Sequence, residues 1–285
     1  VQAAHPTVPA YWPDSSKPTN PGYDGRWGNP LAISERDYSG YSDTDFSSVR
    51  GTFSVNLNFN KWVKGLSADG KFDYRLNNNF VKTFNKSFDY HDYNYDTEEY
   101  TVIGTFNGGK NSLREEYAKD WLWYSMFKLN YDRIFAKKHH ITGLALVEAQ
   151  ANKNDNFFAY REGFISTEVD EMFAGSDENK NNGGGASEGG RMSYVFKLGY
   201  SYDNRYLFDF VGRIDGSAKF YKDNRWGFFP GISAAWRISE EPFFKEKFTN
   251  VDNLKLRLSV GQTGDEANVN FNYLTGYIFG NSWIF

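Results

Sequence analysis

The stretch that decides the fold runs from Gly212 to Glu266. It begins Gly212-Arg-Ile-Asp-Gly-Ser-Ala-Lys-Phe220, continues Asn224-Arg-Trp-Gly-Phe-Phe-Pro-Gly-Ile-Ser-Ala-Ala-Trp-Arg-Ile-Ser-Glu-Glu241, and ends Asn253-Leu-Lys-Leu-Arg-Leu-Ser-Val-Gly-Gln-Thr-Gly-Asp-Glu266. In its last part, apolar side chains alternate with polar or small ones: Leu254, Leu256, Leu258 and Val260 against Lys255, Arg257, Ser259 and Gly261. Successive side chains point to opposite faces of a strand. The alternation therefore predicts a strand with one apolar and one polar face.

The same period-two pattern recurs along the chain. It predicts strands at residues 53–60, 66–77, 121–134, 140–150, 194–201, 206–215, 226–237 and 254–261. The 140–150 stretch fits less well, because Leu144 and Leu146 fall on its polar side. No stretch shows a convincing amphipathic helix, so the sequence predicts an all-β fold.

Alternation does not say which face points outward. A soluble sandwich packs its apolar faces together, whereas a membrane barrel turns them to lipid. The lengths of the connections between strands separate these alternatives. Short turns are expected at 61–65, 136–139 and 202–205, and a medium turn at 240–253. The other connections are two long segments, 78–119 and 151–190, and a shorter one at 216–224. Tight turns at one end and long loops at the other are typical of a transmembrane antiparallel β-barrel.

Composition limits the remaining classes. The 285 residues include no cysteine and carry a formal charge of -4, and the mild acidity argues against a nucleic-acid binder. Aromatic residues make up 19% of the chain, which suits interfacial girdles and ligand-contacting loops. The mean hydropathy of -0.67 is compatible with a barrel, because alternation hides the apolar face from hydropathy windows.

Signatures of catalysis and of cofactor binding are missing from the sequence. The four histidines lack the HExxH spacing, and there is neither a phosphate-binding Gly-Lys-Ser/Thr loop nor a Gly-x-Ser-x-Gly elbow. Asp177, Asn179, Asn181 and Glu188 approach the spacing of a calcium loop, but Asn182 stands where glycine is expected. We therefore predict no enzyme activity, no cofactor and no metal.

Several motif pieces resemble the barrel region of the SusC/RagA family of TonB-linked outer-membrane proteins. They are Arg205-Tyr-Leu-Phe208, Gly212-Arg-Ile-Asp-Gly-Ser217, Arg225-Trp-Gly-Phe-Phe-Pro230, Ala235-Trp-Arg-Ile238, Leu254-Lys-Leu-Arg257 and Gly261-Gln-Thr-Gly264. The resemblance implies a plugged barrel of about 22 strands that imports oligosaccharides or oligopeptides. It also implies energy supplied by TonB through the plug, a SusD-like surface lipoprotein over the extracellular mouth, and surrounding outer-membrane lipid.

The resemblance also implies that residues 1–285 are a fragment of that barrel. Eight or nine strands are too few to enclose a plug, so we expect the plug, the TonB box and the remaining strands to lie outside this chain. The Pro-rich start, up to Pro30, is interpreted as an extracellular loop, and Phe285 as the place where the fragment stops. The alternative to an importer is a soluble or surface β-sandwich that binds glycans; a barrel enzyme is a third hypothesis.

Two groups of residues are candidates for function. Substrate contacts are predicted for Tyr90, His91, Tyr93, Tyr95 and Trp226, because aromatic faces stack on sugar rings; the alternative is that the tyrosines of the 78–119 segment pack that loop or contact the lid lipoprotein. The polar faces of the strands predict lumen-lining charges at Asp69, Lys71, Asp73, Arg75, Asp209, Arg213, Asp215, Lys255 and Arg257. Since both signs occur, we expect these charges to pair across strands and to seat a plug, with substrate guidance as a secondary role.

Overall fold

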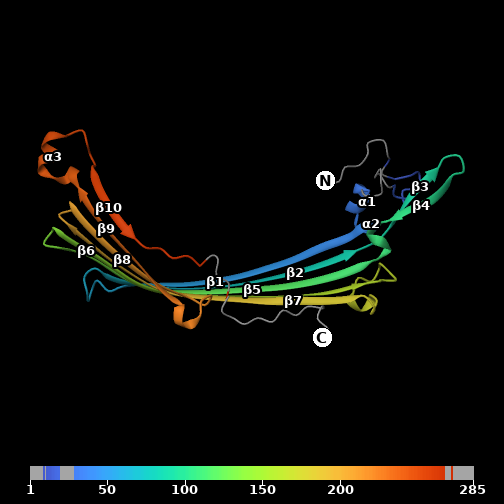
Figure 1. Ribbon diagram of the computed structural model, residues 1–285, viewed down its shortest axis with the longest axis horizontal. Helices are drawn as coiled ribbons and strands as arrows, with labels where there is room; N and C mark the ends of the chain where they lie inside the picture. The colour runs from blue at the N-terminus through green and yellow to red at the C-terminus, as the bar shows by residue number, and fades with distance from the viewer. Residues whose placement is uncertain (1–8, 10, 20–28, 267–270, 272–285) are drawn as a thin grey trace, which may run out of the picture. The chain divides into compact units, whose positions relative to one another are not determined.

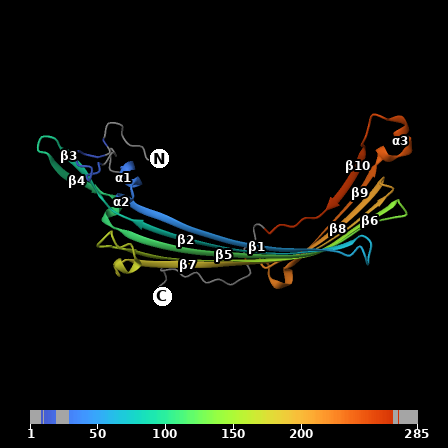
Figure 2. The ribbon, with the colours of Figure 1, turned by 180° about the vertical axis from the view of Figure 1, so that it is seen from behind.

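The computed structural model describes residues 9, 11–19, 29–266 and 271 and is predominantly β-sheet (Figures 1 and 2). One sheet has eight strands in the order β1-β2-β5-β6-β7-β8-β9-β10. Their bounds are β1 (Gly40–Asn58), β2 (Leu66–Asn85), β5 (Ser112–Phe135), β6 (His139–Glu162), β7 (Lys180–Tyr202), β8 (Tyr206–Ser217), β9 (Trp226–Arg237) and β10 (Lys255–Gly261). Apart from an inserted hairpin, each strand lies beside its neighbour in the chain, as in the meander of an up-and-down barrel.

The inserted hairpin forms a sheet of its own. It consists of β3 (Asp89–Asn94) and β4 (Glu99–Thr105), which pair antiparallel. The described residues also contain three short α-helices, α1 (Pro30–Ser34), α2 (Arg36–Ser39) and α3 (Pro242–Lys247). Single 3-10 turns lie at Phe106–Gly109, Met172–Ala174, Lys222–Asn224 and Ile238–Glu240. None of the described helices is long and apolar enough to cross a bilayer.

The predicted strands are confirmed, but five of them are much longer than predicted. Strands β1, β2, β5, β6 and β7 have 19 to 24 residues. As a result, most of the two long segments expected at 78–119 and 151–190 is strand, and the connection between β6 and β7 is only 163–179. Backbone hydrogen bonds between strands do not require an apolar face, so the strands continue beyond the residues that alternate. These outer parts have no alternation, and the sequence pattern therefore did not predict them.

Two compact units divide the chain. Unit 1 contains Val1–Ser48, Asn77–Asp120 and Asn154–Ala186, and unit 2 contains Val49–Leu76, Trp121–Lys153 and Ser187–Phe285. Within unit 2, β7 pairs with β8, β8 with β9 and β9 with β10, all antiparallel and without a register shift. This unbroken register keeps alternate side chains on one face across all four strands.

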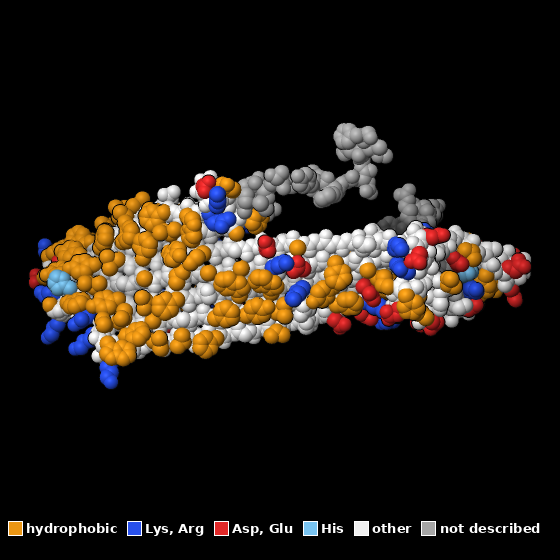
Figure 3. Space-filling model, turned by 90° about the horizontal axis from the view of Figure 1, so that it is seen from below, with side chains coloured by type: hydrophobic (Ala, Val, Ile, Leu, Met, Phe, Trp, Pro, Cys, Tyr) orange, Lys and Arg blue, Asp and Glu red, His pale blue; other side chains and the backbone are white. Residues whose placement is uncertain are grey.

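In unit 2, large apolar side chains are exposed, whereas several polar side chains on the other face are buried. Ser193 is 1% exposed, whereas Leu198 and Phe208 are 52% and 47% exposed, although all three lie on strands with neighbours on both sides. Figure 3 shows hydrophobic side chains gathered over the strands of this unit. A soluble protein buries large apolar side chains, so this arrangement is the inverse of a water-facing sheet.

Unit 1 instead has a small buried core of its own. Phe84, Leu113 and Phe164 are buried together, and Tyr41, Met172 and Ala174 pack against them. Phe164 belongs to the 163–179 connection, and its ring meets that of Phe84 edge-on at 5.2 Å between centroids. The connection is therefore anchored to β2 and β5 by apolar packing.

Candidate functional site

The polar face of unit 2 carries a first cluster of charges on β1, β2 and β5. The Asp73 carboxylate, which is buried, accepts hydrogen bonds from Arg50 Nε at 3.0 Å and from the Thr52 hydroxyl. Asp69 lies four residues before Asp73 on the same face of β2 and contacts Lys128 Nζ at 3.0 Å and Asn130 Nδ2 at 2.7 Å. Each carboxylate is thus compensated across neighbouring strands, as predicted for opposite charges facing each other in a sheet.

Arg213 organises a second cluster on β6, β7 and β8. Its Nε lies 2.7 Å from the Asp215 carboxylate, and one terminal nitrogen contacts Glu148 Oε1 at 3.1 Å and Ser193 Oγ at 3.0 Å. Tyr124 donates a further hydrogen bond to Glu148 at 2.9 Å. Four strands are thereby tied together on the polar face around one guanidinium, whose planar fork suits several acceptors at once.

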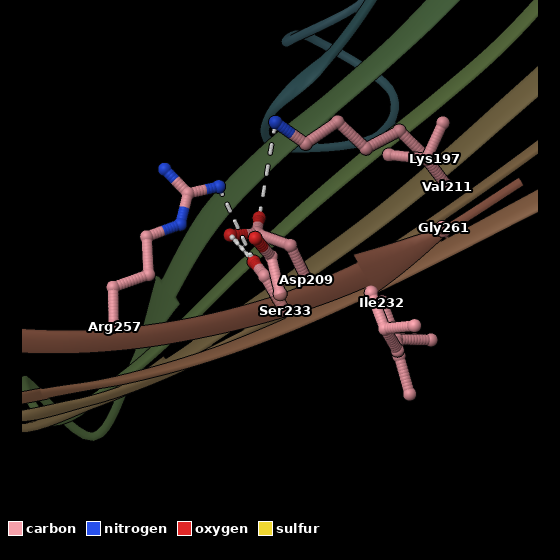
Figure 4. A pocket seen from close by; sticks show the side chains of 10 residues that line it. Lys197, Asp209, Val211, Ile232, Ser233, Arg257 and Gly261 are labelled. Carbon is pink, nitrogen blue, oxygen red and sulfur yellow. Dashed lines mark hydrogen bonds and ion pairs between the residues drawn. The ribbon is translucent and has the colours of Figure 1, made fainter. Parts of the chain in front are cut away.

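A shallow cavity of about 340 Å³ opens on the same face (Figure 4). Asp209 accepts a hydrogen bond from Ser233 Oγ at 3.4 Å and lies 3.8 Å from Lys197 Nζ. Arg257 donates to Ser233 at 3.4 Å, whereas Ile232 points to the opposite side of the ribbon. The cavity therefore presents two cations and one carboxylate of unit 2 to whatever fills the polar side.

The predicted lumen-lining residues have different partners. Asp69, Asp73, Asp209, Arg213, Asp215 and Arg257 join the contacts above, whereas Lys71, Arg75 and Lys255 share their face by strand alternation. Their partners include four residues that were not predicted to lie beside them: Arg50, Lys128, Glu148 and Lys197. Arg50 and Lys197 occupy alternate positions of strands β1 and β7, so the same period-two pattern could have found them.

In unit 1, the predicted substrate-contacting residues of the hairpin pack mainly against other aromatic side chains, Trp12, Phe88 and Tyr100 among them. The Tyr93 ring lies 4.7 Å from Tyr100, 4.9 Å from Tyr95 and 6.1 Å from Trp12 between centroids. Tyr90 is buried, and the His91 backbone carbonyl accepts from Trp12 Nε1 at 2.6 Å. Tyr95 is 71% exposed, so it presents an open aromatic face beside this cluster.

Trp226, the remaining predicted contact, lies on the apolar face of unit 2. Its ring is 5.9 Å from that of Tyr194, and both side chains are about half exposed. Phe228 and Ile232 follow on the same side of β9 by alternation. Trp226 also borders a cavity that Arg191, Asp215 and Arg225 line, and its role as a substrate contact stays a prediction.

A charged cluster fixes the 163–179 connection in unit 1. Lys82 Nζ lies 3.4 Å from both Asp170 and Glu171, and the Tyr41 hydroxyl donates to Asp170. The Tyr41 hydrogen bond and the Lys82 charge hold the pKa of Asp170 below its usual value, whereas burial and the Asp170 contact raise the pKa of Tyr41. These contacts supplement the apolar anchor at Phe164.

The residues with calcium-loop spacing do not converge. Asp177 pairs with Arg161 at 3.1 Å and with Lys180 at 3.5 Å, while Asn181 and Glu188 lie within β7. Within the described part of the chain, no group of three or more His, Cys, Asp or Glu side chains is arranged to hold a metal ion.

Known proteins with similar sequences are TonB-dependent receptors. The chain is 30% identical over 274 residues to TonB-dependent receptor P26 of Formosa agariphila, covering 93% of this chain and 25% of that receptor. It is 48% identical over 94 residues to TonB-dependent receptor SusC of Bacteroides thetaiotaomicron, covering 32% of this chain and 9% of SusC. This chain belongs to the SusC and RagA family of TonB-dependent receptors. No protein-family model matches it.

The fold agrees with this family. The RagAB peptide importer in its 'open-open' state superposes with a TM-score of 0.66 at 17% identity, covering 98% of this chain and 28% of that one. The chain spans about a quarter of the length of the receptors P26 and P39 that it matches. The eight-stranded sheet therefore corresponds to part of a SusC/RagA-type receptor, and the relatives are named receptors rather than enzymes.

Proposed function

We propose that this chain is part of the barrel of an outer-membrane, TonB-dependent importer of large nutrients. The observation that carries the proposal is the inverted burial of unit 2, in which Leu198 and Phe208 are half exposed while Ser193 and Asp73 are covered. Water penalises such a surface, whereas lipid accepts it, since a membrane barrel turns apolar side chains outward and polar ones to its lumen.

Aromatic side chains on β9 support a bilayer of ordinary thickness. Trp226 and Trp236 lie on the same face, ten residues apart. Ten residues extend ~33 Å along a strand, and a tilt of about 40° reduces this to a height of ~25 Å, the height of the apolar band of such barrels. The Trp236 indole donates to Glu241 at 3.0 Å, as does the Tyr206 hydroxyl at 2.6 Å, so one aromatic row has its polar groups satisfied. We assign Trp226 to the other row, at the lipid interface rather than at the substrate.

The charges on the polar face suit a surface that seats a polypeptide plug. Ion pairs around Asp73 and Arg213 neutralise part of the face, while Lys197 and Arg257 make longer contacts, 3.8 Å and 3.4 Å, at the cavity of Figure 4. The plug, the TonB box and the remaining strands would be supplied by other parts of the longer protein. Rearrangement of the plug by TonB would then open a path for the cargo.

Cargo and partner follow from the family and from unit 1. SusC is a TonB-dependent receptor, and RagAB is described as a peptide importer. An oligosaccharide or oligopeptide cargo and a SusD-like lipoprotein lid are therefore the candidates for this chain. The exposed ring of Tyr95, beside the cluster of Tyr93 and Tyr100, is the aromatic surface of the hairpin that would contact either of them.

The alternative, a glycan-binding β-sandwich, needs a second sheet to cover the apolar face. The described residues contain only one other sheet, the two-stranded hairpin, which belongs to unit 1. The apolar side chains of unit 2 remain half exposed, so the sandwich has no core there.

Fractionation of the native source tests the proposal. We expect these peptides in the detergent-extracted outer membrane, in a chain roughly four times as long, together with a surface lipoprotein. Recovery as a soluble species that needs no detergent would refute the barrel.

A transport assay tests the energy source. Uptake of labelled oligosaccharides and of labelled oligopeptides is measured in cells with and without TonB. We expect one cargo class to enter only when TonB is present. Equal uptake of both classes in the two strains would rule out a TonB-dependent importer.

A further inference from the structure

Two neighbouring turns in unit 2 carry an unusual concentration of positive charge. Lys61 and Lys64 lie in the turn between β1 and β2, Lys137 and Lys138 lie in the turn between β5 and β6, and Arg133 precedes the second turn. The Asp132 backbone N–H donates to the Gly65 carbonyl at 2.8 Å, so the two turns lie side by side. Five cations therefore share one small surface.

None of these five cations forms an ion pair with a carboxylate in the described part of the chain. The acidic side chains near the turns have other partners. Asp132 faces His140 Nε2 at 2.9 Å, and Asp203 of the next turn pairs with Arg205 at 2.7 Å. Lone cations on an otherwise paired surface need an external anion or water to compensate them.

Turn chemistry does not explain the lysine at position 137. Ala136 and Lys137 both have positive φ, at 46° and 61°, a conformation that favours glycine or asparagine. The neighbouring hairpin uses Asp203 and Asn204 in the equivalent positions. A lysine at position 137 is therefore more strained than an asparagine would be, and its charge needs another reason.

Large exposed apolar side chains lie among the cations. Trp62 is 76% exposed and Ile134 is 61% exposed, and the Arg133 guanidinium lies over the Phe135 ring at 4.6 Å. Aromatic rings mixed with Lys and Arg are typical of the membrane–water interface, where the rings sit at headgroup level and long cationic side chains reach the phosphates.

We propose that these two turns bind the phosphates of anionic phospholipid headgroups. The inference rests on the proposed function, because only a membrane-embedded barrel brings this surface to a bilayer. Anionic lipid fits better than zwitterionic lipid, since five uncompensated cations gain more from a net negative leaflet. The short turns lie at the end expected to face the periplasm, so the leaflet on that side supplies the lipid.

Competition between two lipids tests this surface. The full-length receptor in detergent is mixed with phosphatidylglycerol and phosphatidylcholine of identical acyl chains, and retained lipids are counted by native mass spectrometry. We expect wild type to retain phosphatidylglycerol preferentially, and K137Q/K138Q to lose roughly fivefold of that preference per lysine at low salt. K61Q/K64Q on the neighbouring turn should behave alike, which guards against a folding defect of one variant.

The matched control is K219Q/K222Q, which removes the same charge from the connection between β8 and β9. In an up-and-down sheet this connection lies at the end opposite to the β1–β2 and β5–β6 turns. It should retain the wild-type preference. Equal retention of the two lipids by wild type, or an equal loss in the control, would overturn the assigned surface while leaving the barrel intact. A receptor that stays soluble without detergent and retains neither lipid would overturn the proposed function itself.

Discussion

Strands β1, β2, β5, β6 and β7 contribute residues to both units, yet the two units cover opposite kinds of side chain. Unit 1 buries Phe84, Leu113 and Phe164, as a water-soluble fold does. Unit 2 covers Ser193 and leaves Leu198 half exposed. One strand can therefore lie in two solvents along its length. The part with alternation suits lipid on its outer face, and the part without alternation suits water.

The largest expected effect comes from placing a charge on the apolar face of unit 2. We expect Leu198→Arg to destabilise the folded receptor in lipid by ~2–4 kcal/mol, the cost of arginine near the bilayer midplane. The matched control is Ile103→Arg in β4 of unit 1, since Ile103 and Leu198 are almost equally exposed at 53% and 52%. The control should cost less than ~0.5 kcal/mol. Denaturant unfolding from lipid vesicles measures both, and equal costs would abolish the contrast between the units.

A smaller effect is expected from the polar face of unit 2. Arg213→Ala leaves Glu148 and Asp215 without their guanidinium, so we expect a loss of ~1–2 kcal/mol, reduced by partial solvent exposure. Lys255 lies on the same face and forms no ion pair among the described residues, so Lys255→Ala should cost under ~0.5 kcal/mol. The same unfolding measurement compares them; an equal loss from both would mean that the Arg213 cluster contributes nothing specific.

The connection 163–179 of unit 1 should respond to pH. The pKa of Asp170 is lower in the folded state than in the unfolded chain, where it is about 3.9. The ionised Asp170 therefore stabilises the fold above pH ~3.9, and this stabilisation is lost as the pH falls through the lowered pKa. Asp170→Asn should remove roughly 0.5–1 kcal/mol at neutral pH and abolish this dependence. Hydrogen exchange of 163–179, corrected for intrinsic rates, measures both the loss of stability and its pH dependence. If the variant keeps the pH dependence of the wild type, groups other than Asp170 cause it.

The smallest effect on stability is expected at Tyr95. Because its ring is largely exposed, Tyr95→Ala should change the unfolding free energy by less than ~0.5 kcal/mol, whereas Tyr93→Ala should cost about 1 kcal/mol through its ring contacts. If Tyr95 contacts the cargo or the lid, its variant weakens their binding without unfolding the hairpin. If the variant binds the cargo and the lid as tightly as wild type, Tyr95 contacts neither of them.

The same contrast explains what could be predicted from sequence. Alternation at 206–215 and 254–261 located β8 and β10 well, because lipid and lumen impose opposite demands on successive residues. Asn78-Asn79 and Gly183-Gly184-Gly185 lie inside strands but show no alternation, so the sequence predicted loops there. Water on both sides of a strand leaves no period-two signal.

The candidate site divides in a similar way. Asp73 and Arg213 could be placed on the polar face by counting along a strand, because strand geometry alone fixes the face. The Lys82–Asp170 contact could not be predicted, since it depends on how the 163–179 connection folds back. Packing of the β3–β4 tyrosines against Trp12 depends on a tertiary contact between distant segments for the same reason.

If unit 2 is part of a membrane barrel, alternate residues of β7 face lipid and lumen, and cysteine labelling along this strand measures which residue faces which. This chain contains no cysteine, and any cysteine elsewhere in the full-length receptor is first replaced by serine, so that single cysteine substitutions at Phe196, Lys197, Leu198, Tyr200 and Ser201 report one position each. In the full-length receptor in brominated lipid, we predict that a fluorophore at 196, 198 and 200 is quenched by lipid and that 197 and 201 react with aqueous maleimide instead. Uniform reactivity, or quenching at 197 and 201, would contradict the barrel.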